Sequence, residues 1–245
     1  MIKEELIFTG AYSGIFLVLF ALGEFLYHKV SVPIEITRKF VHIGTGIICL
    51  SFPFFLESHW SVLFLTVSFA VILVLSKKYQ LLKSINAVRR ATSGAMLFPL
   101  VIYLMFWVYS IYGQHNITGQ HLEHQEFSRF SLGGTIFYFL PILILSVSDP
   151  VAALFGKKWS YGRYSVWGNR KTVVGSSAFF GSAFILSAFF VIPNTINLNC
   201  GLLICLCVAA ASTALEAISD KGYDNLFIPL SVASVLVIFN QYLLL

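Results

Sequence analysis

The acidic side chains with the clearest chemical pattern are Glu216, Asp220 and Asp224, which fall within nine residues. Glu216, Ser219 and Asp220 share one face of a helix by their spacings of three and four, and Gly222 is placed to end that helix. Carboxylate oxygens are the ligands that hard cations such as Mg²⁺ prefer. The segment therefore predicts the acidic half of a metal site; a surface salt-bridge patch is the alternative.

A further carboxylate, Asp149, is followed directly by Pro150. An N-cap residue followed by proline at the first helical position is a signature of a helix start. The pair stands at one end of an apolar stretch, where a carboxylate is costly unless it is paired or holds a cation. We therefore predict that Asp149 joins the acidic site, with a plain N-cap as the alternative.

Basic residues, hydroxyls and glycines alternate over residues 162–177. The spacing differs from that of a Walker P-loop, but Arg170 and Lys171 stand just before a predicted helix whose first turn holds Thr172, Gly175 and Ser176. Free backbone N–H groups at a helix N-terminus attract anions. The segment predicts phosphate binding; the alternative is a basic loop followed by small residues that pack helices.

A second basic group consists of Arg38, Lys39 and His42, all on one side of a helix, with Gly46 one turn further on. Such a cationic face at the end of an apolar helix suits phosphate. The alternative is ordinary basic anchoring of a membrane helix.

The elements that must position these groups are apolar. Of the 245 residues, 58% are hydrophobic and 11% are charged, against roughly 25% charged in a soluble domain. The mean hydropathy of +0.83 excludes a soluble globular enzyme and a disordered chain. We predict an all-α, polytopic integral membrane bundle of about eight transmembrane helices (seven to nine), in one domain over residues 1–245. Their predicted ranges are 6–27, 40–56, 60–76, 94–112, 132–148, 172–192, 199–217 and 226–245.

The basic residues predict the orientation. With the N-terminus outside, every one of the sixteen Lys and Arg residues except Lys3 and Arg129 lies in an inner loop, as the positive-inside rule requires. Both termini are then on the non-cytoplasmic side, and all four polar groups lie at the cytoplasmic face. The pI of about 9.0 therefore reflects membrane orientation, and no nucleic-acid partner is predicted.

In their order along the chain, these motifs resemble the CTP-dependent membrane kinases of lipid alcohols, the dolichol, phytol and farnesol kinase family. The matching residues extend over about 24–230 and comprise Arg38, Lys39, His42, Gly46, Arg90, Thr92, Gly94, Phe98, Pro99, Asp149, Ala152, Ala153, Gly156, Gly162, Lys171, Thr172, Gly175, Ser176, Glu216, Asp224, Asn225 and Pro229.

The resemblance implies transfer of the terminal phosphate of CTP, with Mg²⁺, to an isoprenoid alcohol of the phytol, farnesol, geranylgeraniol, polyprenol or dolichol type. It implies that Asp149, Asp224 and Glu216 hold the metal and that Lys171 is catalytic, while Asp220 or Glu216 accepts the alcohol proton. The other nucleotide-binding residues that it implies are Arg38, Lys39, His42, Gly156, Lys157, Arg170, Thr172, Gly175, Ser176 and Asn225. The membrane would be the bacterial inner membrane or, in a eukaryote, that of the endoplasmic reticulum or plastid.

Two other functions stay open. The segment from Asp149 to Gly175 also resembles part of the phosphatidate cytidylyltransferases, although their Lys-Arg, Lys-Asp and Gly-His-Gly-Gly segments have no counterpart here. A small transporter is the second alternative, but it is expected to hold polar groups near the bilayer midplane.

Overall fold

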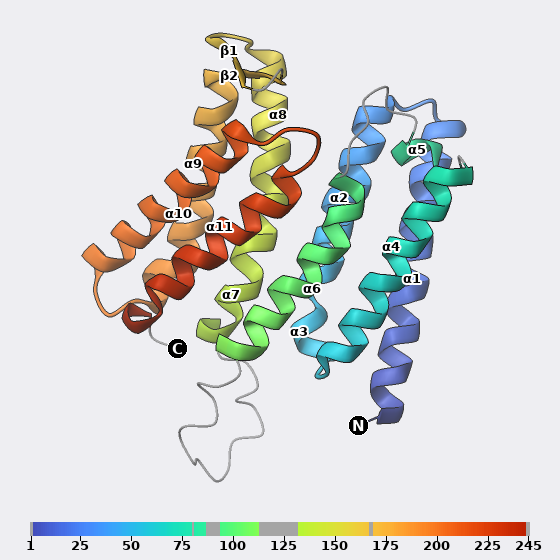
Figure 1. Ribbon diagram of the computed structural model, residues 1–245, viewed down its shortest axis with the longest axis horizontal. Coiled ribbons are helices and arrows are strands. Elements are labelled where there is room, and N and C mark those ends of the chain that lie inside the picture. The colour runs from blue at the N-terminus through green and yellow to red at the C-terminus, as the bar shows by residue number, and fades with distance from the viewer. Residues whose placement is uncertain (1, 80, 87–93, 113–131, 167–168, 244–245) are drawn as a thin grey trace. The chain divides into compact units, whose positions relative to one another are not determined.

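The computed structural model describes residues 2–79, 81–86, 94–112, 132–166 and 169–243. They form two compact units, residues 1–103 and 104–245. Apart from one short hairpin, the described elements are helical (Figure 1), which confirms the prediction of an apolar helical bundle. Arg90, Thr92 and Arg129 lie outside the described residues.

The first unit is built from long apolar helices joined by short ones. Its elements are α1 (Ile2–His28), α2 (Ile34–Leu50), α3 (Phe52–Phe55), α4 (His59–Tyr79), α5 (Lys83–Asn86) and the first half of α6 (Gly94–Tyr112). Helix α1 packs against α2, α4 and α5. Its buried Phe16 stacks edge-on against Phe69 of α4 at 4.4 Å between ring centroids, and Tyr12 stacks on Phe52 at 4.8 Å, so aromatic contacts fill this core.

The second unit contains the rest of α6, then α7 (Leu132–Leu143), a π-helical turn (Ile144–Ser148), α8 (Asp149–Lys158), β1 (Arg163–Val166), β2 (Asn169–Thr172), α9 (Val173–Val191), a 3-10 turn (Ile192–Asn194), α10 (Leu198–Ile218), α11 (Asp224–Ile238) and a second 3-10 turn (Asn240–Tyr242). Helix α9 packs against α8 and α10, and α11 packs against α10 and α7. The β1–β2 hairpin lies at the end of α8 and α9 (Figure 1).

Six helical segments of the described chain are long and apolar enough to cross a membrane: Lys3–His28, His59–Tyr79, Gly94–Tyr112, Gly134–Lys158, Val173–Asn194 and Leu198–Ile218. The other two predicted spans are also helical, but α2 has 17 residues with Glu35, Arg38 and Lys39 in its first turns, and α11 has 15. The count of eight and the orientation of the termini stay predictions.

Asp149 is not the N-cap of a separate helix, contrary to the sequence prediction. Helix α7, the π-helical turn and α8 form one continuous rod, in which Ser148 and Asp149 both have right-handed helical dihedral angles. The Asp-Pro pair did not mark a helix start because proline can also lie inside a continuous helix when the preceding turn is π-helical. The wider turn makes room for the proline ring and tolerates the missing N–H.

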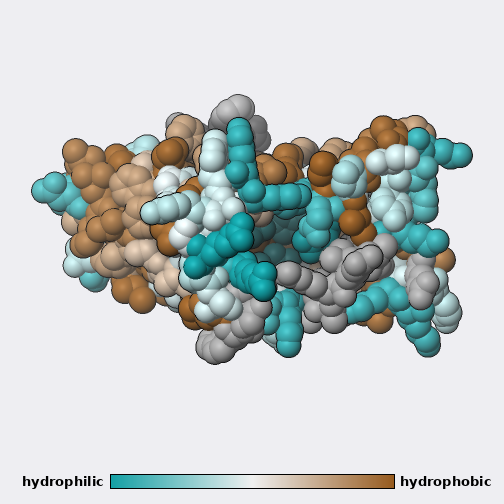
Figure 2. Space-filling model, turned by 90° about the horizontal axis from the view of Figure 1, so that it is seen from above, coloured by the Kyte–Doolittle hydropathy of each residue, from teal (hydrophilic) through white to brown (hydrophobic). Residues whose placement is uncertain are grey.

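Polar side chains gather at the end of the second unit that carries the hairpin. Figure 2 shows hydrophilic surface there, with hydrophobic surface along the flank of this unit. Trp159 and Tyr161, just after α8, are 48% and 81% exposed, and the Lys158 ammonium lies 4.5 Å from the centre of the Trp159 ring. Exposed Trp, Tyr and Lys together are typical of a lipid–water boundary.

Candidate functional site

A buried ion pair joins β2 to the last turn of α10. Lys171 Nζ lies 2.5 Å from Glu216 Oε1 and also donates to the backbone carbonyl of Glu216. The two side chains are only 14% and 9% exposed. Leaving either charge alone at such burial costs several kcal/mol, so each of these residues fixes the position of the other across 45 positions of the chain.

Two hydroxyls extend this pair. Ser176 Oγ, in the first turn of α9, lies 3.5 Å from Glu216 Oε2 and 2.6 Å from the Tyr164 hydroxyl. Tyr164 pairs with Lys171 across the hairpin. The hairpin, α9 and α10 therefore meet at one polar cluster, which we call the Lys171 cluster: Tyr164, Lys171, Ser176 and Glu216.

Gly156 and Gly175 let α8 and α9 approach closely beside this cluster. A Cβ on Gly175 would lie 3.0 Å from the Ala152 carbonyl oxygen, and one on Gly156 would lie 2.7 Å from Thr172 Oγ1. Thr172 is the N-cap of α9, and its hydroxyl oxygen accepts from Gly175 N at 3.0 Å. The structure thus gives these three residues roles in packing and capping, next to their predicted role in nucleotide binding.

The carboxylates after α10 lie on a turn. Helix α10 ends at Ile218, with Ser219 extended, so Asp220 does not share a helix face with Glu216 as the sequence predicted. The helix ends before the predicted Gly222, and Lys221 and Gly222 beyond it take left-handed dihedral angles.

Asp220 and Asp224 each hold the next residue's backbone. Asp220 Oδ1 accepts from Lys221 N at 2.6 Å, and Asp224 Oδ1 accepts from Asn225 N at 3.0 Å. Asp220, Asp224 and Asn225 are half-buried, as is Asp149, one turn before Ala152 on α8. The acidic residues thus stand on α8, on the turn after α10 and at the start of α11, all in the same unit.

The remaining predicted cations lie at the surface or in the other unit. Lys157 and Arg170 are exposed at the end of α8 and on β2. Arg38 forms a partly exposed pair with Glu35 at 3.1 Å, and His42 stacks edge-on against Phe98 at 4.9 Å. Lys39 is half-buried beside them on α2. Arg38, Lys39 and His42 belong to the first unit, whereas the Lys171 cluster belongs to the second.

Comparison with known proteins identifies the family. A phytol kinase from Synechocystis sp. is 32% identical over 203 residues, which cover 83% of this chain and 78% of that protein. The chain belongs to the phytol kinase family. No protein-family model and no solved structure matches it.

For this member of the phytol kinase family, oxygen donors suitable for Mg²⁺ are present as half-buried carboxylates on Asp149 and Asp224. Glu216, the third predicted ligand, is bound to Lys171. Within the described residues no three Asp, Glu, His or Cys side chains are grouped closely enough to hold a metal ion. The donor chemistry fits Mg²⁺, and a complete ligand set needs oxygens from a bound phosphate, as is common for this ion.

Tyr164 is the residue of the Lys171 cluster that sequence analysis left out. The segment was predicted to bind phosphate, with a basic loop as the alternative. Arg163–Val166 and Asn169–Thr172 are strands, and the first of them alternates exposed and half-buried positions. The aromatic and β-branched residues of Arg163–Val166 were the available signal.

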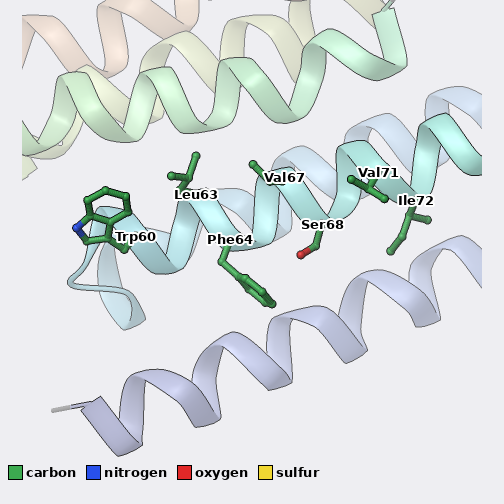
Figure 3. A pocket seen from close by; sticks show the side chains of 7 residues that line it. All are labelled: Trp60, Leu63, Phe64, Val67, Ser68, Val71 and Ile72. Atoms are coloured by element: carbon green, nitrogen blue, oxygen red, sulfur yellow. The ribbon is translucent and has the colours of Figure 1, made fainter.

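The hollow along α4 is a different kind of surface. It is lined by Trp60, Leu63, Phe64, Val67, Ser68, Val71 and Ile72, all from one helix (Figure 3). Its single hydroxyl and lack of charge cannot hold a phosphate. It suits hydrocarbon, as the face of a membrane helix does.

Proposed function

We propose that this chain transfers the terminal phosphate of CTP to an isoprenoid alcohol in the bilayer, with phytol as the first candidate acceptor. The relative from Synechocystis sp. is named a phytol kinase. The observation that carries the proposal is the buried Lys171–Glu216 pair at one end of a bundle of membrane-length helices. It combines a phosphate-binding cation with an apolar surrounding for a lipid acceptor.

Lys171 would hold the nucleotide phosphates. Phosphoryl transfer needs alignment and neutralisation of charge more than covalent catalysis. A bound phosphate would offer Lys171 anionic oxygens in place of the Glu216 carboxylate. The positive charge of the ammonium would then keep an anionic partner throughout the exchange. Exposed Arg170 and Lys157 stand where they would attract the triphosphate, and Arg38, Lys39 and His42 would complete the cationic wall.

Asp149 and Asp224 would hold Mg²⁺, joined by Glu216 once its carboxylate is released from Lys171. The ion would neutralise charge on the transferred phosphoryl group. We assign proton acceptance to Asp220, because Glu216 would be occupied as a ligand of the metal ion. Asp220 is half-buried on the turn after α10, and a carboxylate within reach of the acceptor hydroxyl serves as a general base.

The test is phosphorylation by purified protein in lipid vesicles, with phytol, farnesol, a long polyprenol and diacylglycerol as acceptors and CTP or ATP as donor. A kinase releases CDP, whereas a cytidylyltransferase releases pyrophosphate. We expect CDP and a phosphorylated prenyl alcohol. Pyrophosphate with a CDP-lipid would reverse the assignment, and flux of a solute without nucleotide would favour a transporter.

Lys171→Ala is the variant that tests the role of this lysine in the same assay. Removing a group that stabilises charge in the transition state costs roughly 10²–10³-fold in rate, so we expect activity below about 1% of wild type. Lys78→Ala, on the exposed end of α4, is the control and should retain full activity. Wild-type rates from Lys171→Ala would refute the role of this residue.

A further inference from the structure

Ser146 and Ser148 are 2% and 0% exposed, and neither Oγ has a hydrogen-bond partner among the described residues. The buried hydroxyl oxygens of Ser84, on α5, and Thr213, on α10, also lack one. By contrast, the buried hydroxyls of Ser187, Ser212 and Ser231 each donate to a backbone carbonyl three or four residues earlier, at 2.7 Å. An unpartnered buried hydroxyl is destabilising and calls for a specific reason.

The backbone accounts for the missing local bonds. Both serines lie in the π-helical turn Ile144–Ser148. A π-helical turn bonds from residue i to i+5, which displaces the carbonyl that a serine in an α-helix would use. The same turn precedes Pro150 and carries Asp149 at its end. The hydroxyls are thus left available next to a predicted catalytic carboxylate.

The surroundings of the two hydroxyls are neutral and apolar on one side. Ile142, Ile144 and Leu145 precede and flank them on the rod and are completely buried, and the π-helical turn packs against α7, α9 and α11. In the other direction come Asp149 and then Ala152, whose carbonyl lies against Gly175 of α9. Along the rod the order is therefore hydrocarbon, hydroxyls, carboxylate and finally the basic end of α8.

That order matches an amphiphile with a neutral polar end. A phosphate needs cationic partners and a metal ion needs several oxygen ligands, and the two serines supply neither. An alcohol hydroxyl can both donate to and accept from a serine hydroxyl, and its hydrocarbon tail belongs among Ile and Leu side chains. We propose that Ser146 and Ser148 bind the hydroxyl of the lipid alcohol and hold it beside Asp149; this rests on the proposed function.

The experiment compares Ser146→Ala, Ser148→Ala and the double variant with Ser187→Ala. Phytol binding is measured without nucleotide, as the shift in thermal midpoint on adding phytol, and the KM values for phytol and CTP are measured separately. Losing a hydrogen bond worth about 1 kcal/mol weakens binding roughly fivefold. We expect the KM for phytol to rise about fivefold in each single variant and more in the double one, and the KM for CTP to change less than twofold.

The thermal midpoint measured without phytol distinguishes a binding role of the two serines from a purely structural one. Because alanine removes an unpartnered buried hydroxyl, the ligand-free midpoint should stay the same or rise in the two variants and fall in Ser187→Ala, which loses its bond to the Ala183 carbonyl. A lower midpoint with unchanged KM for phytol would indicate a structural water and overturn the proposal. If the double variant is active and binds phytol as tightly as wild type, the role of the two serines is overturned, while the proposed kinase function stays intact.

A wild-type protein that phosphorylates no alcohol would contradict the proposed function instead. In that case the binding measurement still decides the role of the serines. Phytol binding that is weakened in the double variant would support the site, whereas no stabilisation of the wild type by phytol or farnesol would refute it.

Discussion

In the first unit, Glu5 and Glu24 each accept a hydrogen bond from the backbone N–H of a distant residue, Ser58 and Ser84, at 2.7 Å. In the second unit, Glu216 pairs with a buried lysine and lies next to the Ser176 hydroxyl. The first arrangement satisfies backbone donors in turns between apolar helices. The second places opposite charges where burial makes them costly.

This difference separates carboxylates that stabilise the fold from a carboxylate that is proposed to take part in the reaction. A carboxylate that accepts from a backbone N–H contributes to fold stability, and the second partner of Glu24, His28 at 3.1 Å, is 48% exposed rather than buried. A buried ion pair is weak evidence for stability, and its cation can change partner when a phosphate arrives. The comparison therefore predicts that variants of Glu5 and Glu24 change stability alone, whereas variants of Glu216 change stability and activity together.

The largest effect is expected from Glu216→Ala. Removing one partner of a buried pair costs about 3–5 kcal/mol, so the free energy of unfolding should fall by about that amount and activity should be lost. Glu24→Ala should cost about 1–2 kcal/mol, since it removes one bond to a backbone N–H, and should leave the KM for CTP unchanged. Denaturant titration and kinetics on the same preparations measure both. Equal losses of stability in the two variants would remove the distinction.

The next effect concerns the helix contact at Gly175. Ala at this position places a Cβ 3.0 Å from the Ala152 carbonyl oxygen, and overpacking of this kind costs about 1–3 kcal/mol. Gly14 of α1 has no atom within 4 Å of such a Cβ, so Gly14→Ala should be neutral or stabilise by up to about 1 kcal/mol. Thermal midpoints of the two variants give the comparison. A Gly175→Ala protein as stable as wild type would contradict the close approach of α8 and α9.

A smaller effect is expected from Tyr164→Phe. Each unit contains one tyrosine–serine hydroxyl bond among the described contacts, Tyr164 to Ser176 at 2.6 Å and Tyr12 to Ser51 at 2.7 Å. Loss of either should cost about 1 kcal/mol. Only Tyr164→Phe should also lower kcat, by about threefold to tenfold, because Ser176 then no longer positions Glu216. An equal change of kcat in Tyr12→Phe would show that loss of stability, and not the Lys171 cluster, causes the lower kcat.

The smallest effect on stability is expected from Arg38→Ala. Its pair with Glu35 is 38% and 49% exposed, and such pairs contribute roughly 0–1 kcal/mol. If Arg38 belongs to the proposed cationic wall, the KM for CTP should nevertheless rise several-fold, while Glu35→Ala leaves it unchanged. An unchanged KM in Arg38→Ala would restrict the nucleotide site to the second unit.

Much of the fold followed from composition, and three residues of the Lys171 cluster followed from motif chemistry. Long uncharged runs favour helices in lipid, and six of the eight predicted spans coincide with described helices of membrane length. Lys171 and Ser176 were predicted from one segment and Glu216 from another, and the structure brings these three together.

The details that escaped prediction depend on contacts between distant segments. The pairing of Lys171 with Glu216 joins residues 45 positions apart, and no local pattern specifies it. Asp149-Pro150 is equally compatible with a new helix and with a rod that widens by a π-helical turn. The end of α10 at Ile218 was missed because the predicted stop signal, Gly222, lies four residues further along the chain.

The rod that carries Ser148 also gives the proposed reaction a direction. The ten residues of α8 separate Ser148 from Trp159, about 15 Å at 1.5 Å per residue. A neutral prenyl alcohol loses little hydration in sinking that far below the boundary that Trp159 and Tyr161 mark. Its phosphate ester carries up to two negative charges, and these are strongly disfavoured at the same depth. In the proposed reaction the acceptor would therefore enter from the hydrocarbon, and the phosphorylated product would move outward toward water.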